Sequence, residues 1–121
     1  MSIRSEVIVR IQTDLSGRFR VIDNTGDDKK LVSGQFPDIL LYGKETAIND
    51  TLLFIMKVEN GGELVDSVPL WKSLSGTPTG FYIVVQKDKL NEAKKLAAVT
   101  GVKARFAWYE KANDKLVVHY E

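Results

Sequence analysis

Three charged side chains stand out because they lie at the ends of apolar, strand-like segments. Asp38 lies near the start of residues 36–42, and Lys57 and Glu59 stand at the end of residues 51–58. Lys57 and Glu59 are two positions apart, so they project from the same face of a strand. If the two segments pair as antiparallel neighbours, we expect all three side chains to converge. Carboxylates that bind Mg²⁺ beside a lysine can activate water and stabilise charge on a phosphate, which is the chemistry of phosphodiester hydrolysis.

Each of these residues also has a purely structural interpretation. An aspartate after a proline is common where a turn leads into a strand, because its carboxylate accepts bonds from local amides. A lysine at the end of a buried strand covers apolar surface with its stem and keeps its ammonium in water. A glutamate at the start of a loop pairs with a neighbouring lysine. The residues alone leave both interpretations open.

The segments around these residues predict a sheet with flanking helices. Apolar residues at helical spacing predict a helix over residues 3–15, although the β-branched residues within 6–12 also allow a strand there. Residues 24–30 are polar and contain glycine, which predicts a turn, and residues 43–50 are expected to form a loop. Strands are expected over residues 18–23, 36–42, 51–58, 81–85, 103–109 and 116–120.

Two further helices are expected between the later strands. Apolar residues between positions 64 and 74 predict one that starts afresh near Pro69, and an amphipathic stretch from 90 to 99 predicts another that ends at Gly101. Residues 51–58 are apolar at both alternating positions, which is typical of a central strand covered on both faces. The sequence therefore predicts an α/β domain with a mixed central sheet, in the order helix, three strands, helix, strand, helix, strand, strand.

The segments Phe36-Pro37-Asp38-Ile39-Leu40 and Leu53-Phe54-Ile55-Met56-Lys57-Val58-Glu59 place an aspartate and a lysine on successive strands. At these residues the chain resembles the PD-(D/E)xK nuclease-like superfamily. The resemblance covers most of the chain and implies a restriction-endonuclease-like core. It implies Asp38 as a metal ligand, Lys57 as the catalytic lysine and Glu6, on the first helix, as an additional acidic residue at the metal.

One position departs from the superfamily pattern. The residue two before Lys57 is expected to be acidic, and here it is Ile55. Glu59 faces the same way as Lys57 and is the candidate replacement ligand, although it is displaced by about four strand residues, or ~13 Å at ~3.3 Å each. The departure puts activity in question and leaves the fold expectation intact.

Two hypotheses of function follow. The first is a Mg²⁺-dependent nuclease acting on DNA, which the pair Asp38 and Lys57 favours. The second is a catalytically inactive member of the fold that binds nucleic acid or protein, which Ile55 and the near-neutral charge favour. A third, an unrelated regulatory α/β module, depends on the first segment being a strand.

The composition sets further limits. A length of 121 residues fits a single domain, 1–121. The absence of cysteine excludes a disulfide framework, a thiolate metal site and a cysteine nucleophile, and is compatible with a reducing compartment. Seventeen basic and sixteen acidic residues give a net charge of +1, lower than is usual for a protein that coats nucleic acid.

The sequence also bears on location and partners. The longest apolar run, residues 52–56, is far shorter than the ~20 residues of a spanning helix, and the first residues lack a secretory pattern. We therefore expect a soluble, cytoplasmic protein without a membrane partner. If a domain this small acts on duplex DNA, a homodimer or a partner subunit is expected. The single histidine, His119, is expected to be an exposed residue of a terminal strand.

Overall fold

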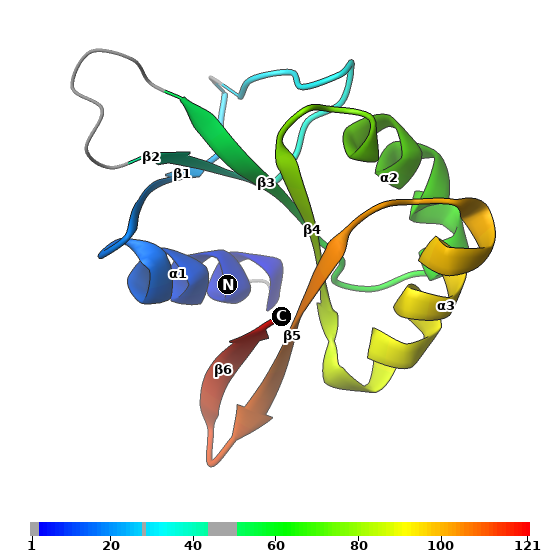
Figure 1. Ribbon diagram of the computed structural model, residues 1–121. Coiled ribbons are helices and arrows are strands. Elements are labelled where there is room, and N and C mark those ends of the chain that lie inside the picture. Colours follow the sequence, from blue (N-terminus) through cyan, green and yellow to red (C-terminus); the bar gives the residue numbers. More distant parts are fainter. Residues whose placement is uncertain (1–2, 28, 44–50) are drawn as a thin grey trace.

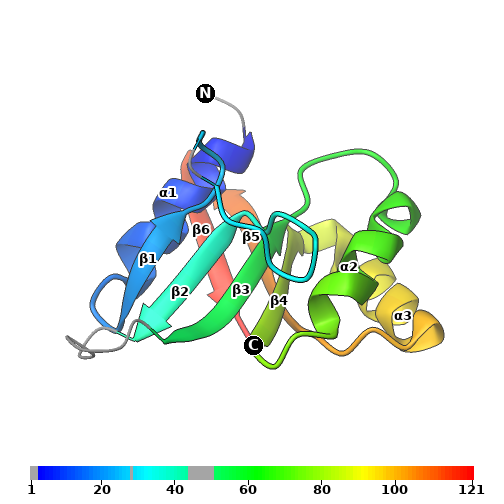
Figure 2. The same ribbon diagram turned by 90° about the horizontal axis from the view of Figure 1, so that it is seen from above.

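Six strands form one mixed sheet that lies between helices (Figures 1 and 2). The computed structural model describes residues 3–27, 29–43 and 51–121. The helices there are α1 (Ile3–Leu15), α2 (Val68–Ser75) and α3 (Leu90–Thr100), with 3₁₀ turns η1 (Leu64–Ser67) and η2 (Lys87–Lys89). The strands are β1 (Phe19–Asp23), β2 (Ile39–Gly43), β3 (Leu52–Val58), β4 (Gly80–Gln86), β5 (Arg105–Ala112) and β6 (Lys115–Tyr120).

The strands lie in the sheet in chain order, from β1 to β6. β2 is antiparallel to β1 and β3, β3 to β5 run parallel, and β6 is antiparallel to β5. Parallel neighbours need a crossover, which α2 and α3 supply, whereas a tight turn joins antiparallel neighbours. Asn113 and Asp114 form such a turn between β5 and β6, with φ of 52° and 64°, as two-residue hairpins of type I′ require. The predicted α/β class with a mixed sheet is confirmed.

The first segment is a helix and not a strand. Val7, Ile8 and Ile11 are buried against the sheet, whereas Val9 is 51% exposed. A strand would place Val7, Val9 and Ile11 on the same face, so only helical spacing accounts for this pattern. The hypothesis that depended on a strand here loses its basis. No helix among the described residues is long and apolar enough to cross a membrane.

Apolar cores lie on both faces of the sheet, and β3 contributes to each. Ile55 packs in the core beneath α2 and α3, which also holds Trp71, and Met56 packs in the core beneath α1; both residues are fully buried. Figures 1 and 2 show α1 on one face of the sheet and α2 and α3 on the other. The prediction that residues 51–58 form a central strand is therefore confirmed.

Several predicted boundaries were wrong by a few residues. β2 begins at Ile39 and not at residue 36, and it includes Gly43, which was assigned to a loop. β5 begins at Arg105 and runs to Ala112, beyond the predicted end at residue 109, because the tight hairpin lets the β5–β6 ladder continue to its turn. Residues 44–50 of the predicted loop and residue 28 of the predicted turn lie outside the described residues.

Candidate functional site

Asp38 lies directly before β2, at the carboxyl end of β3, and is buried. Its backbone N–H donates to the carbonyl of Met56 at 2.9 Å, so the pairing with β3 continues past the first residue of β2. Asn24 fixes the approach of the chain, because its side-chain amide donates to the carbonyl of Pro37 at 2.9 Å and its backbone N–H donates to that of Asp38 at 2.8 Å. The position of Asp38 is thus set by β3 on one side and by the loop after β1 on the other.

Protein donors occupy both carboxylate oxygens of Asp38. Oδ2 accepts a hydrogen bond from the backbone N–H of Val58 at 2.7 Å and lies 3.3 Å from the ammonium of Lys57. Oδ1 accepts a hydrogen bond from the guanidinium of Arg4, on α1. A buried carboxylate needs partners of this kind, because an isolated buried charge is very unfavourable.

Glu59 follows β3 and is also buried. Its Oε1 accepts a hydrogen bond from the hydroxyl of Ser67 at 2.6 Å, and its Oε2 accepts one from the indole N–H of Trp71 at 3.1 Å. Its backbone is held as well, since its N–H donates to the carbonyl of Val84 at 2.8 Å and its carbonyl accepts from the hydroxyl of Tyr109 at 2.9 Å. Glu59 is therefore fixed to α2 and to the two strands beyond β3.

Lys57 lies between the two carboxylates. Its ammonium is 3.3 Å from Oδ2 of Asp38 and 3.9 Å from Oε2 of Glu59. The structure thus brings the three predicted residues together, as antiparallel pairing of their strands suggested. We call Arg4, Asp38, Lys57 and Glu59 the ion-pair network: its charges alternate in sign and it joins α1, the sheet and α2.

Glu6 does not join the network. Its carboxylate lies 3.6 Å from the ammonium of Lys111 on β5, and its side chain is more than one-third exposed. The residue of α1 that reaches Asp38 is Arg4 instead. The first helix therefore brings a cation to Asp38, where the family resemblance implied a carboxylate.

The oxygen atoms of the network do not form a set that suits Mg²⁺. Magnesium needs near-octahedral oxygen ligands, several of which are waters. Here the oxygens of Asp38 and Glu59 already face N–H and O–H donors, and the ammonium of Lys57 lies where it would repel a second cation. Among the described residues, no group of three or more histidine, aspartate or glutamate side chains is placed to hold a metal ion. Magnesium binding stays a prediction.

Ile55 stands where the resemblance implies a second acidic ligand. It pairs with Leu40 on β2 and Phe81 on β4, and its side chain is fully buried in the core beneath α2 and α3. A carboxylate at this position would face apolar side chains and would need its own partner. Isoleucine is therefore explained by packing.

Sequence reasoning did not identify Arg4, Ser67 or Tyr109 as partners of the predicted site. Trp71 is fully buried in the core, and its indole N–H also binds Glu59. A buried indole needs an acceptor, which is the one signal that could have linked Trp71 to an acidic residue. Nothing in the sequence singles out Arg4, because its reach depends on how α1 crosses the sheet.

The hydroxyl of Tyr109 is held in its neutral form. Burial, followed by the charges of Asp88 and Glu59, raises the pKa of this phenol above its ordinary value. Tyr109 therefore stays a hydrogen-bond donor to the carbonyl of Glu59 across the ordinary pH range.

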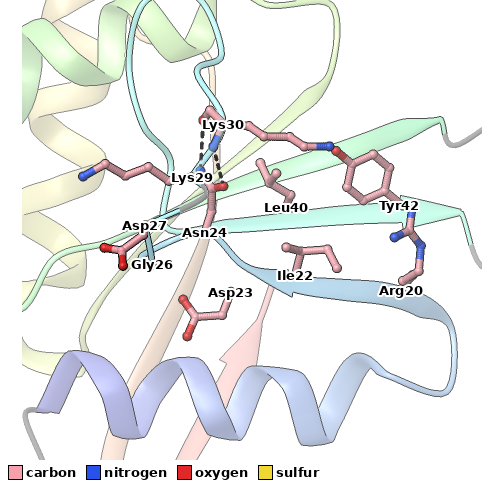
Figure 3. Close-up of a pocket in the computed structure, with 10 residues that line it drawn as sticks. All are labelled: Arg20, Ile22, Asp23, Asn24, Gly26, Asp27, Lys29, Lys30, Leu40 and Tyr42. Atoms are coloured by element: carbon pink, nitrogen blue, oxygen red, sulfur yellow. Dashed lines mark hydrogen bonds between the residues drawn. The ribbon is translucent and has the colours of Figure 1, made fainter.

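A pocket of about 340 Å³ lies beside β1 and β2, separate from the network (Figure 3). Its floor includes Ile22 and Leu40, and the ring of Tyr42 lies 4.6 Å from the guanidinium of Arg20 and 5.6 Å from the ammonium of Lys30. Asn24 forms two hydrogen bonds with the backbone of Lys30, and both residues line the pocket. The acidic residues Asp23 and Asp27 also line it, so its charge is mixed.

His119 and the lysines between residues 87 and 103 carry less chemistry. His119 is exposed on β6, as predicted, where it stacks on Trp108 at 5.6 Å and lies 3.3 Å from Glu110. Lys87 pairs with Glu110, and Lys94 pairs with Glu121. The charges of Lys87 and Lys94 are thus balanced locally.

Comparison of the chain with protein-family models, with curated proteins and with solved structures found no match. The geometry of the side chains is therefore the basis for a functional proposal.

Proposed function

We propose that this chain is a non-catalytic member of the restriction-endonuclease-like fold that acts as a binding module. The observation that carries the proposal is the closed state of the ion-pair network. Both oxygens of Asp38 and both oxygens of Glu59 are engaged by protein donors, and Lys57 takes the place between them. The four carboxylate oxygens are satisfied, whereas Nε of Arg4 is buried without a hydrogen-bond partner. Opening the contacts that satisfy two buried carboxylates would be unfavourable.

The resemblance to the fold rests on three supports. A helix precedes a three-strand antiparallel meander, helical crossovers lead to parallel strands, and Asp38 meets Lys57 from the adjacent strand. Ile55 supports the absence of nuclease activity. It stands where the resemblance implies a second acidic ligand and is fully buried, so position 55 supplies no carboxylate to a metal site.

A Mg²⁺-dependent DNA nuclease is the second candidate, and the approach of Lys57 to Asp38 favours it. In such an enzyme the two carboxylates would hold the metal, which supplies an activated water, and Lys57 would stabilise negative charge on the phosphate. Arg4, Ser67 and Trp71 would first have to release the oxygens that they now bind.

Metal titration combined with cleavage assays separates the two candidates. Mg²⁺ and Mn²⁺ are titrated into the purified protein by calorimetry, and duplex, branched and single-stranded DNA are tested as substrates. We expect no metal binding in the millimolar range and no cleavage. Metal-dependent cleavage that Asp38→Ala and Lys57→Ala both abolish, while Lys72→Ala on the exposed face of α2 does not, would overturn the non-catalytic proposal. Circular dichroism of each variant shows that loss of cleavage is not loss of folding.

A further inference from the structure

α1 lies on one face of the sheet, whereas α2 and α3 pack on the other face (Figures 1 and 2). Beyond the end of α1 this face presents partly buried aromatic side chains, including Phe19, Phe54 and Tyr82. They line a pocket of about 370 Å³, a size within the ~300–1,000 Å³ range of small-ligand sites. We call it the aromatic pocket.

The aromatic rings are held in a fixed row. The ring of Phe54 meets that of Phe19 edge to face at 5.8 Å, and that of Tyr82 at the same distance. Gly80, which pairs with Phe54 across β3 and β4, makes room for this row, because a Cβ at position 80 would lie 2.4 Å from the Phe54 ring. The flat surface of Phe54 therefore depends on a glycine on the neighbouring strand.

The rim of the pocket is positively charged. Arg18 and Arg105 line it, both side chains are exposed, and neither forms an ion pair within the described part of the chain. The one acidic side chain of the lining, Glu121, lies 2.8 Å from the ammonium of Lys94 and accepts a hydrogen bond from the backbone of Phe106. The hydrogen bond from Lys94 and, to a smaller extent, the charge of Arg105 lower the pKa of the Glu121 carboxyl. Two guanidinium groups beside one carboxylate leave the lining with an excess of positive charge that attracts an anion.

The aromatic pocket is separate from the ion-pair network. Phe54 lies three residues before Lys57 on β3, about 10 Å along the strand. Arg105 and Phe19 open β5 and β1, whereas Glu59 follows the last residue of β3. Changes in the pocket therefore leave the contacts of Lys57 in place.

We propose that the aromatic pocket binds a nucleotide unit, with its base against the Phe54 row and its phosphate at Arg18 and Arg105. Bases stack on aromatic side chains regardless of their sequence, and guanidinium groups bind phosphate through paired N–H donors. The floor consists of aromatic rings, with Phe19 at 86° and Tyr82 at 58° to the plane of Phe54. Such a floor with two arginines at the rim matches a ligand that is aromatic at one end and anionic at the other. This assignment rests on the proposed binding function and names its ligand.

The test is calorimetric titration of the intact chain with nucleoside 5′-monophosphates. Unphosphorylated nucleosides and inorganic phosphate are the matched controls, and a short single-stranded oligonucleotide forms a second arm. We expect the monophosphates to bind more tightly than either half alone. Tighter binding of the oligonucleotide assigns the nucleotide to a single strand, and equal or weaker binding assigns it to a free nucleotide.

Variants locate the binding in the pocket. Arg105→Gln, an exposed change that leaves the core intact, is expected to weaken binding roughly tenfold, as loss of one charge-assisted hydrogen bond does. Lys103→Gln removes the same charge two residues away, outside the pocket lining, and is expected to leave affinity unchanged. Phe54→Leu tests the stacking surface and is checked for folding by thermal denaturation.

Three results would overturn the assignment: no binding of any nucleotide or oligonucleotide, phosphate alone binding as well as the monophosphates, or equal weakening by Lys103→Gln and Arg105→Gln. None of these would restore the nuclease candidate. Conversely, cleavage that needs Asp38 and Lys57 but survives Arg105→Gln would overturn the non-catalytic proposal alone. The two failures are therefore distinguishable.

Discussion

The ammonium of Lys57 lies 3.3 Å from Oδ2 of Asp38, and the two residues come from opposite ends of adjacent antiparallel strands. Arg4 approaches the other oxygen of Asp38 from α1, and Glu59 continues the chain of charges toward α2. In the described structure this relationship joins two helices on opposite faces of the sheet. Asp38 and Lys57 are the residues that a catalytic site would use, and they are also the residues that link the two helices. Measuring how much they contribute to stability therefore bears on which role they have.

Asp38→Asn is expected to lower the free energy of unfolding by about 3 kcal/mol. The variant keeps the size of the side chain but removes the negative charge between Arg4 and Lys57, and loss of one partner from a buried ion pair is strongly destabilising. Urea denaturation measures the change. Asp66→Asn, at an exposed acid of η1, is the control and is expected to change stability by less than about 0.5 kcal/mol. Equal effects of the two substitutions would show that the network adds nothing to stability.

Trp71→Phe is expected to cost about 2 kcal/mol. The phenyl ring fills most of the buried site, but Oε2 of Glu59 loses its indole donor, and an acceptor left without that partner in the interior is costly. The free energy of unfolding is measured by chemical denaturation for Trp71→Phe and for the control Trp108→Phe. The ring of Trp108 is only partly buried and stacks on His119, so the control reports the cost of a smaller ring without the loss of a bond to Glu59. A smaller loss for Trp71→Phe than for Trp108→Phe would contradict this role of Glu59.

The sequence was sufficient for features that depend on local pattern. The apolar run of β3 marked the centre of the sheet. The spacing of Val7, Ile8 and Ile11 favoured a helix over a strand, and the burial of these residues decided between the two. The approach of Asp38 to Lys57 could be predicted because strand pairing fixes which ends are neighbours.

Other features depend on tertiary packing and could not be read from spacing. Arg4 reaches Asp38, and Glu6 turns to Lys111, because of how α1 lies across the sheet. The aromatic pocket brings together residues from β1 to β6, from the end of α1 and from the chain that follows it, so no local motif marks it. The contact between Gly80 and Phe54 exists only because β3 and β4 pair in one register.

Stability is expected to fall as the pH rises above about 10. Burial raises the pKa of the Tyr109 phenol above its ordinary value of 10.0. Burial, followed by the hydrogen bond to Asp14, raises that of Tyr120 as well. Since the folded chain then holds protons that the unfolded chain releases, the contribution is complete below pH 10 and is lost at higher pH.

The variant Tyr120→Phe tests this linkage. It removes one of the two groups, so the alkaline decline should become shallower by up to about 1.4 kcal/mol per pH unit. Unfolding free energies between about pH 9 and pH 11 give the two slopes. Identical slopes for the variant and the unmodified chain would show that Tyr120 does not contribute.

Gly80→Ala is expected to destabilise the protein, whereas Gly76→Ala is not. A Cβ at position 80 would lie 2.4 Å from the ring of Phe54, so the ring must move and its contacts with Phe19 and Tyr82 are disturbed. Overpacking of this kind costs about 1–3 kcal/mol.

At position 76 the nearest atom is a carbonyl oxygen at 3.6 Å, and φ is −80°, which alanine adopts without strain. Gly76→Ala should therefore be neutral or stabilise by up to about 1 kcal/mol, because alanine restricts the unfolded chain. Thermal denaturation of both variants measures the difference, and an equal response would mean that the Phe54 ring has room to move and that Gly80 does not fix the aromatic row.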